Sequence, residues 1–227
     1  MKPSLSLRAP CFLLLAVVLC PLILPDCVAE DSVKTILFER AEKQDPIEPE
    51  WFRFDIDGVS YKVLSRGQAT RTRANGTSDS FRLPLEKDDT IEEVYFASVS
   101  GGVLIVYGFR CWDTDGAAGA ATQLVEPYLS VKWAAEIPAF NVGPPLLAGT
   151  ELYVTAIGFV GKLNIVDGRY LWRHDGLYRS QDNRYNSFDR PRIGADVVEF
   201  PESISLVTAT RSPYVLRVNR RTGKIIE

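Results

Sequence analysis

Histidine is almost missing from this chain, because His174 is its only copy. Imidazole is the usual base at neutral pH and a common metal ligand, so one copy excludes a site built from several histidines. His174 follows Trp172 just beyond an expected strand, which favours an exposed loop position. The sequence also lacks a Gly-x-Ser-x-Gly motif, a phosphate-binding glycine loop followed by Lys and Ser or Thr, and a metal-spaced pair of cysteines. We therefore expect a non-enzymatic protein with no catalytic residue, no cofactor and no metal.

The beginning of the chain has the pattern of a secretory signal peptide. Lys2 and Arg8 precede an apolar run over residues 9–25, and the small-residue sequence Cys27-Val28-Ala29 follows it. A membrane anchor is the alternative, but three prolines shorten the apolar helix well below the roughly 20 residues that a span requires. We expect cleavage after Ala29, a periplasmic or extracellular location, and no transmembrane span in the mature protein.

Cysteine is scarce once this segment is removed. Of the four cysteines, Cys111 alone lies beyond residue 29. An exported chain with one thiol has no internal disulfide framework, so its stability must come from an ordinary core. A buried structural thiol is the preferred interpretation of Cys111, with redox reactivity or an intermolecular disulfide as the alternatives. The net charge of −3 and the dispersed arginines give no indication of a nucleic-acid partner.

Helical periodicity is also rare. The segment 31–44, with apolar residues at helix-like spacing, is the one convincing helix candidate, although an extended segment is the alternative, and Pro46 and Pro49 end it in either case. From Trp51 onward, short runs rich in Val, Ile, Tyr, Phe and Trp alternate with turn residues, which predicts an all-β domain over residues 51–227 after an N-terminal segment of residues 30–50. The runs are WFRFDI, VSYKVL, EVYFASV, GVLIVYGF, YLSVKWAAEI, ELYVTAI, KLNIVD, RYLWRH, DVVEF, SISLVTA and YVLRVN. Hairpin turns are expected at Asp57-Gly58, Asn75-Gly76, Gly101-Gly102 and Asp167-Gly168.

Part of the chain repeats. Residues 149–172 and 201–226 each contain a strand (ELYVTAI; SISLVTA), a second strand (KLNIVD; YVLRVN) and a tight turn into a third (GRYLW; GKIIE). The first turn is interpreted as the two residues Asp167-Gly168, and the second as the longer segment from Asn219 to Gly223. Residues 101–133 provide a stretched copy with a loop after GVLIVYGF, and residues 58–85 a faint one.

The phrases VLRVNRRTGKII, LYVTA, KLNIVD and GRYLW resemble repeats of the pyrroloquinoline-quinone-like β-propeller family. The resemblance covers roughly residues 90–227. It implies four-stranded blades, each locked to its neighbour by a tryptophan and a closing Thr-Gly turn. The structural blade positions it implies are Trp133, Trp172, Asp167, Gly168, Asn219, Thr222 and Gly223.

The chain departs from the family pattern in two places. Asp167-Gly168 lacks the two residues expected before Thr-Gly, and Ile226 or Glu227 stands where a tryptophan would be expected. At about 40 to 45 residues a blade, the chain has material for about four blades, which predicts a small or incomplete ring. An incomplete ring leaves edges that a partner chain or a second copy could cover. The resemblance implies an assembly scaffold with a protein partner in the cell envelope.

The best candidate for an interaction site is the polar segment 179–192. Arginine and tyrosine are typical anchors of protein interfaces, and the alternative is a solvated loop whose charges pair with one another. The candidate residues are Arg179, Arg184, Tyr185, Phe188, Arg190 and Arg192.

Two further functions stay open. A saccharide-binding module would use Trp51, Trp112 or Tyr178 as stacking platforms, and a hydrolase or lyase would use carboxylates such as Asp182 and Asp189.

Two short motifs have simpler interpretations than a site. Asp113-Thr114-Asp115-Gly116 resembles the start of a calcium loop, but Leu124 stands at its twelfth position, so an acidic turn is preferred. Asn75-Gly76-Thr77 fits a glycosylation acceptor or, more simply, a hairpin turn.

Overall fold

The computed structural model describes residues 34–44, 50–111, 116–179, 184–185, 187–203 and 214–226. Within the unit Val33–Glu227, these residues form antiparallel β-sheets and no helix, which confirms the all-β prediction. No helix in this part of the chain could therefore cross a membrane. The predicted signal peptide, residues 1–29, lies outside the described residues.

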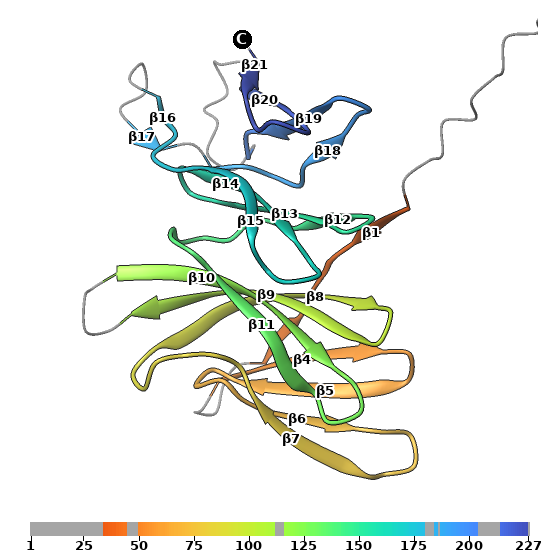
Figure 1. Cartoon of the computed structure of the whole chain (residues 1–227). Helices are drawn as coiled ribbons and strands as arrows, with labels where there is room; N and C mark the ends of the chain where they lie inside the picture. The colour runs from red at the N-terminus through yellow and green to blue at the C-terminus, as the bar shows by residue number, and fades with distance from the viewer. Residues whose placement is uncertain are drawn as a thin grey trace, which may run out of the picture. The chain divides into compact units, whose positions relative to one another are not determined.

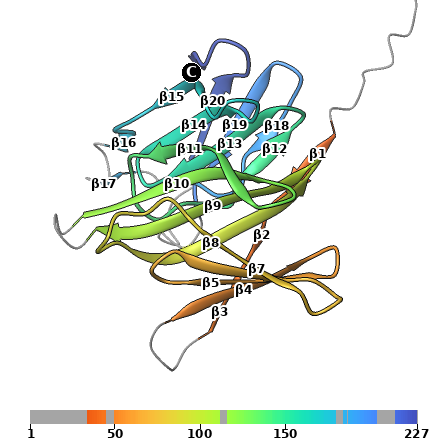
Figure 2. The same cartoon turned by 60° about the horizontal axis from the view of Figure 1, so that its bottom comes forward.

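The main strands form four meanders, called sheets I to IV, in which consecutive strands are neighbours (Figures 1 and 2). Sheet I contains β4 (Trp51–Ile56), β5 (Val59–Leu64), β6 (Gln68–Thr72) and β7 (Ser78–Arg82). Sheet II contains β8 (Thr90–Val99), β9 (Gly102–Cys111), β10 (Gly116–Val125) and β11 (Ser130–Ile137). Sheet III contains β12 (Leu146–Ala148), β13 (Glu151–Ala156), β14 (Phe159–Asn164) and β15 (Tyr170–His174). Sheet IV contains β18 (Arg192–Ile193), β19 (Val197–Pro201), β20 (Val215–Asn219) and β21 (Ile225–Ile226).

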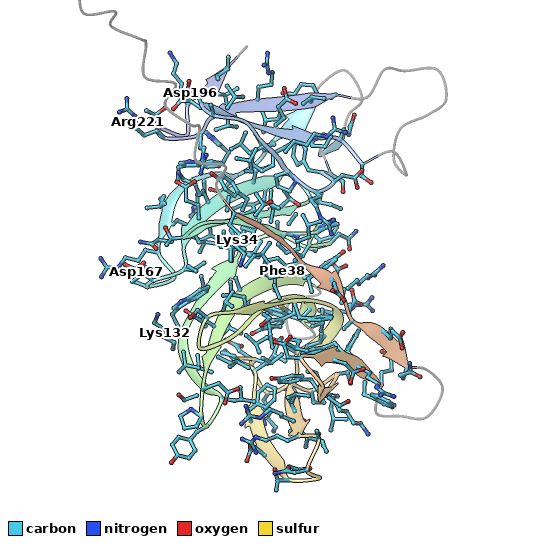
Figure 3. All side chains as sticks on the ribbon, turned by 90° about the vertical axis from the view of Figure 1, so that its right-hand side faces the viewer. Lys34, Phe38, Lys132, Asp167, Asp196 and Arg221 are labelled. Atoms are coloured by element: carbon cyan, nitrogen blue, oxygen red, sulfur yellow. The ribbon has the colours of Figure 1, made fainter. Side chains whose placement is uncertain are left out.

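The N-terminal segment adds one strand to each of three sheets. Strand β1 (Thr35–Leu37) pairs with β12 of sheet III, β2 (Glu39–Arg40) with β8 of sheet II, and β3 (Glu42–Gln44) with β4 of sheet I. Figure 3 shows this segment running from Lys34 past Phe38 across successive sheets. Of the two conformations that the sequence allowed for residues 31–44, the described residues adopt the extended one. These three sheets consequently have five strands, not the expected four.

Strand β10 was missed by the sequence analysis, which placed a loop between the two strands around it. Its first half, GAAGAA, has low β-propensity, but the neighbouring side chains leave room only for small residues. A Cβ on Gly119 would lie 2.5 Å from Val142 Cγ2. Together with β8, the stretched repeat over residues 101–133 therefore forms a regular meander of four strands.

Apolar side chains pack between consecutive sheets. One core cluster joins sheets I and II, a second joins sheets II and III, and a third joins sheets III and IV. The alternating burial of β4, with Phe52 and Phe54 buried, matches its period-2 pattern. On the opposite face of sheet I, Arg53, Lys62, Thr70 and Thr72 are exposed, so this outer face is polar.

The closing turns of sheets III and IV have the same structure. Gly168 donates its N–H to Asn164 O (2.8 Å), and Gly223 donates its N–H to Asn219 O (2.9 Å). Both glycines have positive φ, at 73° and 75°. The prediction of a two-residue turn at Asp167-Gly168 was wrong, because the turn starts at Asn164 and NIVDG matches NRRTG without a gap. Figure 3 shows Asp167 and Arg221, from the two turns, on the same side.

One strand of the proposed repeat was also misplaced. The strand that pairs with β20 is Val197–Pro201, whereas most of the SISLVTA run lies outside the described residues. Sheets III and IV are therefore equivalent through β13 and β19, β14 and β20, and β15 and β21.

The last strands of sheets II and III each have a tryptophan that contacts the closing turn of the next sheet. Trp133 of β11 donates its indole N–H to Ile165 O (2.8 Å), and Trp172 of β15 donates to Arg220 O (3.1 Å). Ile165 and Arg220 occupy the same place, one residue after the asparagine that starts each turn. In each case the turn glycine approaches the indole so closely that a Cβ on it would lie 2.6 Å from the ring.

Between sheets I and II, an arginine takes the place of the tryptophan. Arg71 of β6 is 2% exposed and donates to Pro127 O (2.8 Å) in the turn between β10 and β11. It also pairs with Asp79 and with Glu126. All three sheet junctions therefore use a side chain of one sheet to bind a backbone carbonyl in the closing turn of the next.

Candidate interaction site

The C-terminal part of the segment predicted as a polar interaction loop lies along the edge of sheet IV and ends in strand β18. The N–H of Asp189 donates to Pro201 O, that of Ser203 to Ser187 O, and that of Gly194 to Val197 O, each at 2.8 to 2.9 Å. Residues 187–194 thus run antiparallel to β19 and to the residues just after it. This pairing continues beyond both ends of β18. The segment is the first strand of sheet IV, in the position that β12, β8 and β4 have in the other sheets.

Its N-terminal part forms a hairpin. Strand β16 (Tyr178–Arg179) pairs with β17 (Arg184–Tyr185), with Tyr178 opposite Tyr185 and Arg179 opposite Arg184. The hairpin places the backbone of three candidate residues directly before residues 187–194.

Phe188 does not belong to an exposed surface. It is 2% exposed and packs against Phe200 with ring centroids 6.3 Å apart. The carbonyl oxygen of Phe188 also accepts a hydrogen bond from Thr155 Oγ1 (3.4 Å) of sheet III. Its inclusion among the interaction residues is therefore corrected: Phe188 joins the core between sheets III and IV.

Arg190 connects the segment to the N-terminal strands. Its Nη2 donates to Phe38 O (2.9 Å), which lies between β1 and β2. Its Nε is buried and has no hydrogen-bond partner among the described residues. One end of this guanidinium is consequently fixed, while another donor is left without a partner.

Arg192 is exposed and lies in a row of alternating charges across sheet IV. It is opposite Glu199 of β19, which is opposite Arg217 of β20. Glu199 and Arg217 form an ion pair with Oε1 and Nε 3.3 Å apart. Opposite charges across neighbouring strands stabilise a sheet by about 0.2–1 kcal/mol a pair. Arg192 is the last member of this row on the side of the first strand.

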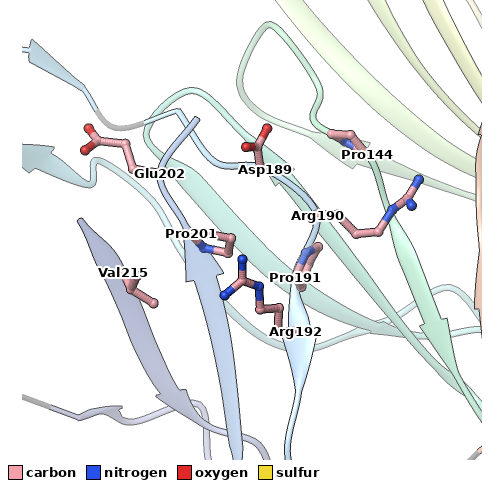
Figure 4. A pocket seen from close by; sticks show the side chains of 8 residues that line it. All are labelled: Pro144, Asp189, Arg190, Pro191, Arg192, Pro201, Glu202 and Val215. Atoms are coloured by element: carbon pink, nitrogen blue, oxygen red, sulfur yellow. The ribbon is translucent and has the colours of Figure 1, made fainter. Parts of the chain in front are cut away.

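A groove of about 810 Å³ follows this segment (Figure 4). Figure 4 shows Arg190 and Arg192 pointing to different sides of Pro191, with Asp189 and Glu202 near one end. The lining residues are Pro144, Asp189, Arg190, Pro191, Arg192, Pro201, Glu202 and Val215. The half-buried Pro144 and Pro201 and an exposed valine next to arginines make a surface of the kind that protein interfaces use.

The carboxyl group of Glu93, on strand β8 of sheet II, lies under the N-terminal segment with 15% of the side chain exposed. Burial raises the pKa of Glu93 to about 7, against the opposing effects of Arg40, of a hydrogen bond from the Val142 N–H and of one from Tyr95. Arg40 of β2 approaches it with Nη2 and Oε2 3.7 Å apart. The pKa of Tyr95 rises to about 12, mainly through burial, while Arg190 lowers it. The charge of Glu93 therefore acts where the N-terminal strands attach.

Glu93 could not be recognised from the sequence, because its burial depends on long-range geometry. The pairing of β8 with β9 shifts register between Ile91 and Glu93, and Gly108 of β9 leaves the space that the carboxyl fills. Glu93 and Gly108 are far apart in the sequence, so no local pattern indicates that they lie side by side in the sheet.

His174 and Cys111 both lie on strands. His174 lies in β15, not in the expected exposed loop, and a ring nitrogen is 2.6 Å from Gly223 O. Cys111 ends β9 and is half-buried, whereas a fully buried thiol was preferred. Burial, followed by the charge of Asp89, raises its pKa, so the nucleophilic thiolate is disfavoured.

Of the residues named for the alternative functions, the structure describes the side chains of Trp51 and Asp189 and the backbone of Tyr178. Trp51 lies on the outer face of sheet I, with Lys62 Nζ 4.5 Å from its ring centroid, so a cation covers the face that a sugar would need. Asp189 lines the groove, whereas Asp182 and Trp112 lie outside the described residues, as do Asp113 and Asp115. No cluster of three metal-ligating side chains occurs in the part of the chain that the structure describes. Asn75-Gly76-Thr77 forms the exposed turn between β6 and β7, where Thr77 N donates to Asn75 Oδ1 (3.0 Å).

Comparisons with known proteins provide a relation of fold only. No protein-family model matches the chain, and no curated protein matches it. Among solved structures, it is similar to BamB from Moraxella catarrhalis, with 14% sequence identity and a TM-score of 0.41. That match covers 66% of this chain and 40% of the BamB chain, so this chain spans less than half of that protein.

Proposed function

We propose that this protein is a non-enzymatic, propeller-like binding module of the cell envelope that holds a partner protein at the groove of sheet IV. The observation that carries the proposal is the groove itself, where Arg190 and Arg192 flank Pro191 beside the exposed Val215. Planar arginine donors next to rigid apolar surface provide both orientation and buried area for a protein partner. Arg190 is held at one end by its hydrogen bond to Phe38 O, which fixes this side chain beside the groove.

The proposed surface includes the hairpin of β16 and β17. Arg179, Arg184 and Tyr185 precede the groove segment directly in the chain and belong to its set of interface residues. Export through the predicted signal peptide places this surface in the periplasm or outside the cell.

Site-specific photo-crosslinking in the source organism tests the proposal. A photoreactive amino acid replaces Val215 in one variant and Val131 in the matched control, since both valines are exposed on strands, at 38% and 43%. We expect a specific adduct with another protein from position 215 and none from position 131. The adduct should be lost when Arg190 and Arg192 are changed to alanine, and reduced by Arg184→Ala with Tyr185→Ala. Equal labelling from both positions, or no protein adduct from position 215, contradicts the proposal.

A further inference from the structure

The first strands of the four sheets differ in what lies on their free side. In sheets I, II and III, this side of β4, β8 and β12 is covered by β3, β2 and β1. In sheet IV, no described strand pairs with the corresponding side of β18. The opposite edges of the sheets, at β7, β11, β15 and β21, have no added strand in any sheet described. An added strand is therefore a regular feature of the first-strand edge, and sheet IV lacks it in the described part of the chain.

The backbone of β18 has groups that such a strand would bind. Gly194 donates its N–H to Val197 O of β19. Because hydrogen bonding alternates along an antiparallel strand, the N–H and C=O of Ile193 point away from β19. They are in place to pair with an incoming strand, as Ala41 N of the N-terminal segment does with Val94 O (2.8 Å) of sheet II.

The side chains beside this edge indicate the chemistry of the strand. A residue added opposite Arg192 would extend the row of Arg192, Glu199 and Arg217, so an acidic residue continues its alternation of charge. In sheet I, Glu42 of the added strand likewise lies opposite an arginine of the first strand, Arg53, although the row there continues to Lys62. Ile193 faces the core between sheets III and IV, so the next position of the added strand should be apolar.

From this geometry we propose that sheet IV binds its protein partner by strand addition, taking an extended segment of alternating acidic and apolar residues along β18. The inference rests on the proposed function and adds the binding mode and the chemistry of the partner. Main-chain hydrogen bonds to Ile193 provide the attachment, and Arg192 selects the acidic side chain.

Peptide probes test this mode directly. The probe is a fluorescein-labelled peptide, acetyl-KTVEVEVTK-amide, and its charge control replaces both glutamates with lysine. Fluorescence anisotropy on the full chain should show the glutamate probe binding at least tenfold more tightly than the lysine probe. Arg192→Glu should reverse this preference, whereas Arg169→Glu, in an exposed turn of sheet III, should leave it unchanged. Ile193→Pro, which removes the edge N–H, should abolish binding.

A second pair of probes keeps the test valid if Ile193→Pro fails to fold. Each probe carries N-methyl groups on every second amide, and the two probes are methylated on opposite sets of amides. One of these sets includes the N–H groups that would donate to the edge of β18, so that probe cannot make these hydrogen bonds. One should bind the wild-type protein at least tenfold more weakly than the unmodified peptide. Equal binding of both, no binding of the unmodified peptide, or an unchanged charge preference in Arg192→Glu overturns strand addition. The function itself would survive that result if position 215 still gives its protein adduct, and it fails if that adduct is missing.

Discussion

Trp172 donates its indole N–H to the carbonyl oxygen of Arg220, and the same contact recurs between Trp133 and Ile165 one sheet earlier. The recurrence shows that successive sheets are joined by one kind of junction. It also places NIVDG and NRRTG in register, so the sheets repeat more regularly than their sequences do. The junctions hold sheet IV, and with it the groove, in position on sheet III.

The two tryptophans should differ in what they contribute. Arg220 O also accepts from Lys162 Nζ (2.6 Å), so Trp172→Phe leaves that carbonyl satisfied. Trp133 Nε1 additionally donates to the buried Gln123 Oε1 (3.0 Å), which would lose this partner in Trp133→Phe. We expect unfolding free energies lower by about 1–2 kcal/mol for Trp172→Phe and about 2–4 kcal/mol for Trp133→Phe, measured by urea denaturation. Equal losses would show that the hydrogen bonds do not determine the strength of the junction.

The turn glycines allow the contact with the indole to be isolated. Gly168→Ala places a methyl group 2.6 Å from Trp133 at a φ of 73°, whereas Gly76→Ala has a φ of 82° with no atom within 4 Å. Backbone strain alone should cost Gly76→Ala about 1 kcal/mol, and the clash should raise the cost for Gly168→Ala to about 2–4 kcal/mol. Thermal and urea unfolding of both variants provide the measurement. Similar losses would mean that the turn moves away from Trp133 without cost.

Arg71 should be far more important than its neighbour Arg73, although both contact Asp79. Arg71 is 2% exposed and binds two carboxylates and Pro127 O, whereas the Arg73 side chain is 35% exposed. Truncating a buried charge that holds two partners should cost about 3–5 kcal/mol, against about 0–1 kcal/mol for Arg73→Ala. Urea denaturation of Arg71→Ala and Arg73→Ala checks this difference. A loss below 1 kcal/mol for Arg71→Ala would exclude the arginine as the junction between sheets I and II.

Glu93 should make stability fall as pH rises towards neutrality. Its pKa of about 7 in the folded protein exceeds the ordinary value of 4.5 for a glutamate, so the folded state favours the protonated form. The resulting stabilisation is present below about pH 4.5 and is lost as pH rises through 7, by about 3 kcal/mol in total. Glu93→Gln should remove this slope, so that the variant is more stable than the wild type at pH 8 and similar at pH 4.5. Denaturation between pH 4.5 and 8 tests it, with Glu92→Gln as the control for loss of one carboxylate; identical slopes in wild type and Glu93→Gln would refute the assignment.

Local sequence patterns were sufficient for strands that alternate apolar and polar residues. Trp51–Ile56 and Val59–Leu64 were predicted at their bounds because period-2 burial and the turn at Asp57-Gly58 act over a few residues. Strand β10 could not be recognised, because its small residues are required by Val142 and by neighbouring strands that the sequence does not reveal. The conformation of strands β1 to β3 could not be predicted for a similar reason, since it is fixed by pairing with three different sheets.

The candidate site was predictable in composition but not in arrangement. Arg190 and Arg192 do lie on the groove, whereas Phe188 faces the core, because the register against β19 shifts by one residue between Phe188, opposite Glu202, and Arg192, opposite Glu199. The open side of β18 becomes visible only by comparison with the three sheets whose corresponding side is covered.

Amide hydrogen exchange at Ile193, followed by NMR before and after addition of the photo-crosslinked partner, tests the central claim most directly. In the free protein, the Ile193 amide should exchange much faster than the amide of Gly194, which is bonded to Val197 O. Bound partner should slow exchange at Ile193 at least tenfold and leave Gly194 unchanged. The account is contradicted if Ile193 is already as protected as Gly194 in the free protein, or if the bound partner leaves its exchange rate unaltered.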